Sequence, residues 1–118
     1  MIKPFVKKIS TLPGYLEEGV TFLPEEGAET ISSNYVRVKQ GQSTPEGLHD
    51  DEEELYIIIG GKARLELGDS VSEVEKGDVV YIPRNVRHRA TCLSEEDFEY
   101  ICVANWPDRI PGQTYAKH

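Results

Sequence analysis

Short segments rich in β-branched and aromatic residues follow one another along this chain, separated by glycine, proline or acidic residues. Such residues favour extended backbone, and almost no stretch shows the 3.6-residue apolar period of an amphipathic helix. Eight or so strands at this regular spacing predict an all-β fold, a closed sandwich or barrel. The expected strands are Val20–Leu23, Thr30–Lys39, Leu55–Ile59, Ala63–Leu67, Val71–Val74, Val79–Ile82, Arg89–Leu93 and Phe98–Ala104.

Glycines and one proline mark where these strands turn. We expect tight hairpins at Gly60-Gly61 and Gly68-Asp69. A positive φ is expected at Gly61 and Gly77, where a hairpin would have to turn. Pro83 follows an apolar run and cannot donate to a sheet ladder, so it ends that strand and opens a loop.

Length and composition narrow the class of protein. At 118 residues the chain has the size of one domain, 1–118. No apolar run approaches the roughly 18 residues of a membrane span, and the N-terminal residues lack the apolar core of a signal peptide. Two cysteines are too few for a disulfide framework, so a reducing cytoplasm is the expected location. Asp and Glu outnumber Lys and Arg by 21 to 13, which disfavours nucleic acid and anionic membranes as partners.

Two histidines and a glutamate stand in two glycine-anchored segments within the window 41–92. The first segment carries His49 and Glu54, and the second carries His88. From neighbouring strands these side chains can point into one cavity, because residues near a barrel rim alternate between lumen and outside. Two imidazoles and a carboxylate with open positions are the ligand set of non-haem Fe(II) sites, and Mn, Ni or Zn could occupy it too.

Both segments resemble the two motifs of the cupin superfamily, whose members are small jelly-roll barrels built as a double-stranded β-helix. The positions that hold the motif intervals are Gly41, His49, Glu54 and Gly61 in the first segment and Gly77, Pro83 and His88 in the second. Asn85 stands where the family prefers glycine, and asparagine tolerates left-handed backbone. Cys92 stands where the family often has asparagine. The resemblance implies a single cupin domain that binds a divalent metal ion.

Gly47 departs from the family pattern. It stands at the position of the first motif histidine and has no side chain to coordinate a metal. The remaining set is His49, Glu54 and His88, which leaves an open coordination position or a site that has lost metal affinity. Glu46 or Asp51 could supply a substitute oxygen ligand. In the cupin register the acids 50–53 are loop residues, and Glu54 alone has a role.

The same histidines also fit a second metal-binding motif. His49, Asp51 and His88 also resemble the His-x-Asp…His triad of 2-oxoglutarate-dependent oxygenases, which use a related barrel. The motif glycines and Pro83 fit the cupin register, and the chain is short for such an oxygenase.

Three further residues are pocket candidates. Arg37 lies on the polar face of its strand; that face is either outside the barrel or, if inside, a clamp for an anionic substrate. Tyr56 suits a cavity wall better than a catalytic role. Cys102 either lines the pocket or serves as a small buried apolar residue.

Three functions follow from the resemblance. The first is a metal-dependent enzyme, a dioxygenase, decarboxylase or isomerase, acting on a small organic acid, sugar or phenolic compound. The second is a non-catalytic module that binds a small molecule or metal, which the histidine missing at Gly47 favours. The third is a structural barrel. A homodimer is expected from the family and from the exposed edges of a small barrel.

Overall fold

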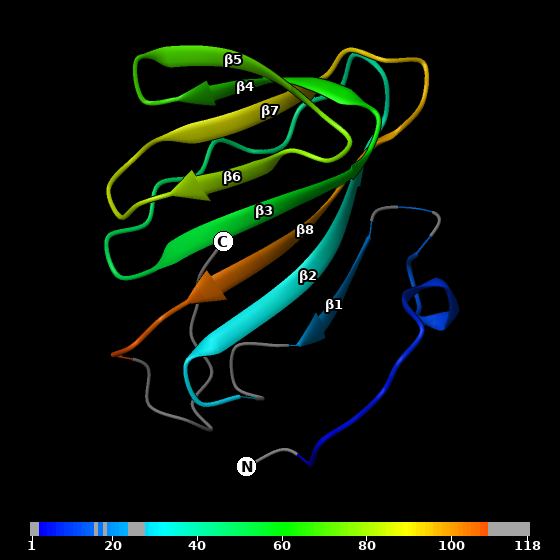
Figure 1. Cartoon of the computed structure of the whole chain (residues 1–118), viewed down its shortest axis with the longest axis vertical. Helices are drawn as coiled ribbons and strands as arrows, with labels where there is room; N and C mark the ends of the chain where they lie inside the picture. The colour runs from blue at the N-terminus through cyan, green and yellow to red at the C-terminus, as the bar shows by residue number, and fades with distance from the viewer. Residues whose placement is uncertain (1–2, 16, 18, 24–27, 109–118) are drawn as a thin grey trace.

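The computed structural model describes residues 3–15, 17, 19–23 and 28–108 (Figure 1). This part of the chain confirms the expected all-β fold, and the observed strands lie within about two residues of those predicted. No helix in it has the length and apolar character that crossing a membrane requires. The elements of the described residues are a 3-10 turn, η1 (Ile9–Thr11), and eight strands: β1 (Gly19–Leu23), β2 (Ile31–Val38), β3 (Glu53–Gly60), β4 (Lys62–Leu67), β5 (Ser70–Glu75), β6 (Val79–Ile82), β7 (His88–Cys92) and β8 (Phe98–Asn105).

The strands form two antiparallel sheets (Figure 1). The larger sheet has the order β1-β2-β8-β3-β6, and the smaller has the order β5-β4-β7. Strand β8 is central because β2 and β3 pair with its two edges over most of their length. Its burial alternates strictly, as expected for a strand with one face toward a core. The core lies on that inner face and draws on both sheets; its largest members are Tyr56, Ile58, Leu65, Ile82, Phe98 and Tyr100.

The hairpin predicted at Gly60-Gly61 is wrong. Strand β3 pairs with β6 and β8, whereas β4 pairs with β5 and β7, so the chain passes here from one sheet to the other. The same crossing occurs at Gly77, between β5 and β6. The predicted positive φ is confirmed at Gly61 (71°) and Gly77 (97°). A Cβ at Gly61 would lie 2.4 Å from the carbonyl oxygen of Asp97, so glycine is needed where the sheets join.

Two other turn predictions are confirmed. Strands β4 and β5 form a hairpin across Gly68-Asp69, with Leu67 opposite Ser70. Asn85 follows the end of β6 with a φ of 64°, the left-handed geometry that asparagine tolerates. This turn leads the chain from the larger sheet to β7 in the smaller sheet and so places His88 at the start of that strand.

On β2, Tyr35 and Arg37 lie on the outer face of the larger sheet, because Asn34 and Val36 between and beside them line the interior cavity. Tyr35 stacks on Tyr15 with 5.2 Å between ring centroids, and its hydroxyl donates to Glu99. Arg37 forms an ion pair with Asp97. The N-terminal segment therefore covers this face, which explains why Tyr35 is buried although it points away from the barrel interior.

The hypothesis that Arg37 clamps a substrate inside the barrel is wrong. Its neighbour Val36 lines the interior cavity, and side chains along a strand alternate between the two faces. The guanidinium of Arg37 is instead held by Asp97 and lies 4.0 Å from Glu99 on the outer face.

Candidate metal centre

Three elements bring His49, Glu54 and His88 together. Glu54 lies on the inner face of β3, and His88 is the first residue of β7. The loop that carries His49 runs along the edge of β7: Gly47 and His88 exchange two backbone hydrogen bonds of 2.9 Å. The backbone N–H of Asn85 donates to the carbonyl oxygen of His49 over 2.7 Å. The loop is thereby fixed like a further strand, which holds His49 beside His88.

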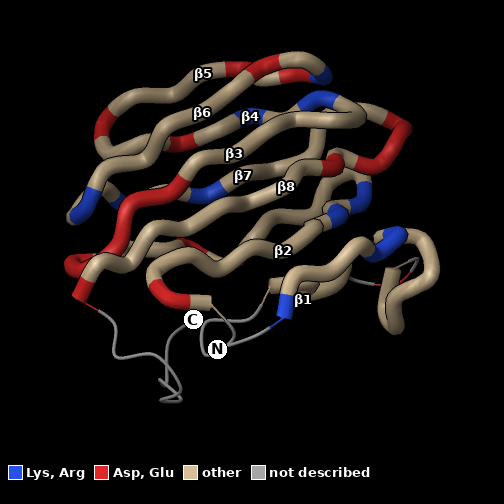
Figure 2. Tube along the Cα trace, turned by 60° about the horizontal axis from the view of Figure 1, so that its bottom comes forward, with Lys and Arg blue, Asp and Glu red and all other residues tan. Residues whose placement is uncertain are grey.

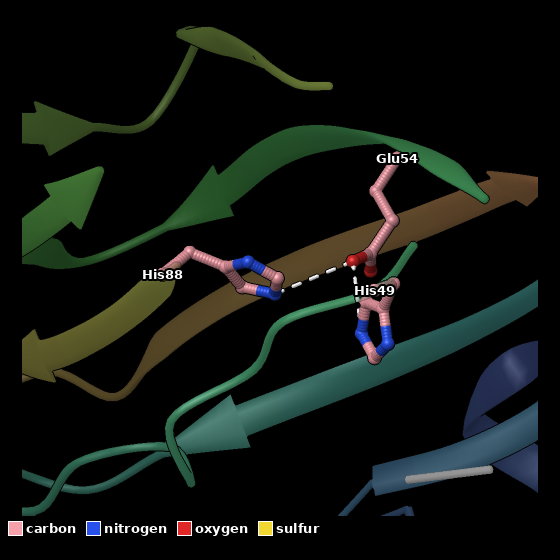
Figure 3. A group of neighbouring side chains, drawn as sticks. All are labelled: His49, Glu54 and His88. Atoms are coloured by element: carbon pink, nitrogen blue, oxygen red, sulfur yellow. Dashed lines mark ion pairs between the residues drawn. The ribbon is translucent and has the colours of Figure 1, made fainter. Parts of the chain in front are cut away.

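The side chains of these residues converge on one carboxylate oxygen (Figure 3). Oε1 of Glu54 lies 3.3 Å from Nε2 of His49 and 3.3 Å from Nε2 of His88. One ligand atom from each residue lies within 4.8 Å of the others. Glu54 and His88 are buried, and His49 is partly buried. The three predicted metal ligands thus form one compact group on the barrel interior.

The hydrogen-bond geometry of His88 leaves its Nε2 for another partner. Nδ1 lies 3.0 Å from the carbonyl oxygen of Val86, and a carbonyl only accepts, so Nδ1 carries the hydrogen. In the neutral imidazole, Nε2 then presents a lone pair to Glu54. Oε1 of Glu54 is buried and has no conventional hydrogen-bond partner among the described residues. Two acceptors facing each other need a proton or a metal ion between them, so the donor set fits a divalent cation.

The pKa shifts agree with this geometry. Burial raises the pKa of Glu54, but contacts with His88 and Cys102 outweigh burial and hold that pKa below its ordinary value. Burial lowers the pKa of His88, whereas contacts with Glu54 and the Val86 carbonyl raise it, and the net shift is upward. The carboxylate is therefore ionised at neutral pH, and the group attracts a cation.

Gly47 packs directly against the ring of His88. A Cβ at residue 47 would lie 2.5 Å from Nε2 and 2.9 Å from Cε1 of His88. Carbon atoms do not approach a ring this closely, so any side chain at residue 47 requires His88 to move. The place of the missing motif histidine is therefore occupied by part of the His88 ring and is not a hole in the site.

The prediction that the acidic residues before Glu54 are all loop residues without a role does not hold for Glu52. Figure 2 shows an acidic stretch leading into β3. Within it Glu52 is only 1% exposed, and its Oε1 lies 3.6 Å from Nε2 of His49. Because strand side chains alternate, Glu52 shares the inner face with Glu54. This alternation is visible in the sequence and could have placed Glu52 on the inner face, although the sequence analysis assigned it no role.

The two proposed substitute ligands lie farther out. Glu46 and Asp51 both line the cavity, but neither belongs to the compact ligand group. Glu46 is exposed and forms an ion pair of 3.5 Å with Arg87. The group contains Glu54 and not Asp51, as the cupin register requires and the 2-oxoglutarate oxygenase register does not.

A cavity of about 630 Å³ adjoins the three residues. Tyr56 lines it, stacks on Tyr100 with 4.4 Å between ring centroids, and makes a T-shaped contact with the ring of His88. Burial raises the pKa of both phenols, so they remain protonated at neutral pH. Cys102 also lines the cavity, and its thiol donates to Oε2 of Glu54 over 3.0 Å. The lining residues from β2, which the sequence did not single out, are Ser32, Asn34 and Val36.

Comparison with known proteins identifies the family. A family model described as a cupin domain matches residues 34–104, which is more than half of the chain. The chain belongs to the cupin family. The matched range contains all three residues of the candidate metal centre and every strand from β3 to β7.

Individual relatives of this cupin are distant. An uncharacterized protein of Streptomyces coelicolor is 33% identical over 57 residues, 48% of this chain and 53% of that protein. This chain therefore spans about half the length of that curated relative.

Two solved structures share the fold. An uncharacterized protein of Klebsiella pneumoniae with a double-stranded β-helix domain has a TM-score of 0.74 at 16% identity, over 90% of this chain and 93% of that chain. A Cupin 2 conserved barrel domain protein of Salinispora arenicola has a TM-score of 0.67 at 23% identity, over 88% of each chain. At these identities the likeness concerns the fold.

Proposed function

We propose that this cupin binds a divalent metal ion through His49, Glu54 and His88 and is a metal-dependent enzyme for a small molecule held in the adjoining cavity. The observation that carries the proposal is the position of Glu54 Oε1, buried and 3.3 Å from an imidazole nitrogen on each side. A carboxylate buried without a cation is costly, and two imidazole nitrogens are ordinary ligands of Fe, Mn, Ni or Zn.

The protein residues have separable roles in this proposal. Nδ1 of His88 donates to the Val86 carbonyl, so Nε2 is the nitrogen offered to the metal. Glu54 brings the one negative charge of the ligand set. A bound divalent ion would supply Lewis-acid or oxygen-activating chemistry beside the cavity. The stacked rings of Tyr56 and Tyr100 would form one apolar wall for the substrate.

The ligand set supports three reaction classes. Two histidines and one carboxylate leave several coordination positions for substrate or dioxygen, which suits a dioxygenase, decarboxylase or isomerase. A small organic acid, sugar or phenolic compound is of a size that a cavity of about 630 Å³ can hold.

A second candidate function is a module that binds a small molecule or a metal without turnover. Gly47 favours it, because the ring of His88 packs where the fourth ligand of the family would begin. Oxygen consumption separates the dioxygenase form of the first candidate from the non-catalytic module. Protein loaded with Fe(II) under anaerobic conditions should consume dioxygen with at least one compound of a substrate panel if it is a dioxygenase.

Metal content tests the proposal directly. Protein purified without a histidine tag should contain, or take up, close to one divalent ion per chain, and the melting temperature should rise when metal is added. Protein that binds neither Fe(II), Mn(II), Ni(II) nor Zn(II), and whose melting temperature stays unchanged, would contradict the metal-dependent enzyme and the metal-binding form of the second candidate.

One substitution should identify the ligand set. His88→Ala removes an imidazole that Glu54 faces, and we expect metal affinity to fall by at least about a hundredfold, beyond the 10–100-fold typical of outer partners. Asp51→Asn is the matched control, since Asp51 lines the cavity outside the ligand group and should keep affinity within about threefold. A loss of affinity in Asp51→Asn as large as that in His88→Ala would favour the 2-oxoglutarate oxygenase register, in which Asp51 and His88 are both ligands. Circular dichroism should show that both variants fold.

The cellular setting stays a prediction. We propose a cytoplasmic homodimer that acts on a small molecule and binds neither nucleic acid nor membrane, in line with the net charge of −8. Sedimentation of the purified chain measures the oligomeric state.

A further inference from the structure

Cys102 contacts the candidate ligand Glu54 from a third strand. It lies on β8, directly opposite Tyr56 of β3 in the register of the larger sheet. Its side chain is buried, and its sulfur lies 3.0 Å from Oε2 of Glu54. Oε1 of the same carboxylate faces the two histidines instead. The two oxygens of Glu54 therefore have different partners.

The direction of the contact follows from elementary chemistry. An ionised carboxylate only accepts hydrogen bonds, so the thiol is the donor. Burial raises the pKa of Cys102, and the charge of Glu54 raises it further, so the sulfur keeps its hydrogen at neutral pH. A hydrogen bond to an ionised acceptor is stronger than one between neutral groups. The thiol can therefore limit rotation of the carboxylate about its last bond.

We propose that Cys102 is a positioning residue that fixes Glu54, so that Oε1 alone faces the metal and the carboxylate binds through one oxygen. The proposal rests on the proposed metal site, because it assigns the geometry of a ligand in that site. A free carboxylate can offer both oxygens to one ion, which occupies an additional coordination position. By holding Oε2, Cys102 would keep that position available for the ligand in the cavity.

The second cysteine of the chain provides a matched control. Cys92 is also buried, but it lies on β7 in the smaller sheet. Its sulfur contacts the carbonyl oxygens of Ser94 and Glu96, each at 3.5 Å. The two thiols thus share burial and differ in acceptor: Cys102 donates to a carboxylate and Cys92 to neutral carbonyl groups.

Infrared spectroscopy of the metal-free protein tests the hydrogen bond itself. The S–H stretching band that disappears in Cys102→Ser should lie at lower frequency than the band that disappears in Cys92→Ser, because the carboxylate is the stronger acceptor. Glu54→Gln should move the Cys102 band to higher frequency and leave the Cys92 band in place. A Cys102 band that does not respond to Glu54→Gln would overturn the proposal without any reference to metal.

Metal binding tests the consequence for Glu54. Cys102→Val keeps approximate volume and loses the donor, and we expect it to weaken Co(II) binding about tenfold, as loss of an outer partner typically does. The visible absorption spectrum of Co(II) bound to this variant should indicate a higher coordination number, because the second oxygen of Glu54 would also bind the ion. Cys102→Ser keeps a donor and should recover most of the affinity and the wild-type spectrum. Cys92→Val should change neither quantity.

The outcomes separate the two proposals. If Cys102→Val keeps the wild-type affinity and spectrum, or if Cys102→Ser loses as much as Cys102→Val, the positioning role is rejected while the metal site stands. If the wild-type protein binds no Co(II), the proposed metal site is rejected, and the role of Cys102 in ligand geometry is rejected with it.

Discussion

The two faces of the larger sheet carry polar clusters that neutralise their carboxylates in different ways. On the outer face, Arg37 supplies a permanent cation to Asp97. On the inner face, the described groups beside Glu54 that can carry a positive charge are the imidazoles of His49 and His88, which are charged when protonated and neutral otherwise. The outer cluster contains its own counter-charge, whereas the inner cluster must take up a proton or a metal ion.

This difference in charge supports the proposal that the inner cluster is the functional one, whereas burial does not distinguish the clusters, because both are largely shielded from water. An Arg–carboxylate pair is complete as it stands and contributes to stability or specificity of folding. A carboxylate between two neutral imidazoles carries a negative charge that no permanent cation offsets, so this group can bind a proton or a metal ion. The comparison predicts that changes on the inner face alter metal affinity, and that changes on the outer face alter only stability.

The largest loss of metal affinity in this comparison is expected from a substitution at Gly47. Gly47→Ala places a Cβ 2.5 Å from Nε2 of His88 and must displace the ring that offers this ligand atom. We expect a loss of metal affinity of about a hundredfold or more, close to the loss of the ligand itself, with about 1–3 kcal/mol of lost stability from overpacking. Isothermal titration and urea unfolding measure the two quantities.

Gly41→Asn is the control for Gly47→Ala. Gly41 has a positive φ of 79°, which asparagine tolerates, and a Cβ there meets nothing within 4 Å. Its metal affinity should match that of the wild type. If Gly47→Ala also bound metal like the wild type, the ring position of His88 would not matter for the site.

Metal affinity should also depend on pH. Nε2 of His88 binds metal only without a proton, and its pKa is raised above the ordinary value of 6.5. Affinity should be level above the raised pKa and fall by about tenfold per pH unit below it, as one proton competes with the metal. Competition with a chelator across this pH range measures the slope. An affinity that is independent of pH would exclude His88 as a ligand.

The stability of the metal-free protein should also depend on pH. Metal affinity rises as His88 loses its proton, whereas the free energy of unfolding should fall. The raised pKa of His88 contributes stability that is present below its unfolded value, 6.5, and is lost as pH rises through the folded pKa. The lowered pKa of Glu54 contributes stability that is present above its unfolded value, 4.5, and is lost as pH falls through the folded pKa. The contribution of this pair is therefore greatest between these two values. His88→Ala should flatten this part of the profile of unfolding free energy against pH.

The smallest effect on metal binding should come from the outer cluster. Arg37→Leu leaves Asp97 without its guanidinium partner, and we expect a loss of about 1–3 kcal/mol in the free energy of unfolding, since both side chains are only partly exposed. Metal affinity should stay within about twofold of the wild type. Arg84→Leu, at an exposed position, should change stability by less than about 0.5 kcal/mol. A loss of metal affinity in Arg37→Leu would show that the two faces are coupled.

Much of the fold was predictable because its signals are local. Alternating β-branched and aromatic residues predicted the strands, and glycine spacing predicted positive φ at Gly61 and Gly77. The hairpin expected at Gly60-Gly61 was wrong because a glycine pair marks a turn without stating which strands pair afterwards. The sequence also could not decide on which face of the sheet Arg37 lies. Alternation assigns the residues of a strand to two faces, and only packing decides which face is inside.

The sequence by itself determined the candidate ligands and their spacing: His49, Glu54 and His88. Its motifs also indicated the family. The tertiary structure alone decided that Glu54 faces both imidazoles, that the ring of His88 packs on Gly47, that Glu52 is buried beside His49, and that Cys102 holds the second oxygen of Glu54. These contacts join residues on different strands. Spacing along a chain specifies backbone conformation, whereas contacts between side chains depend on sheet register and packing, which form only when the whole barrel closes.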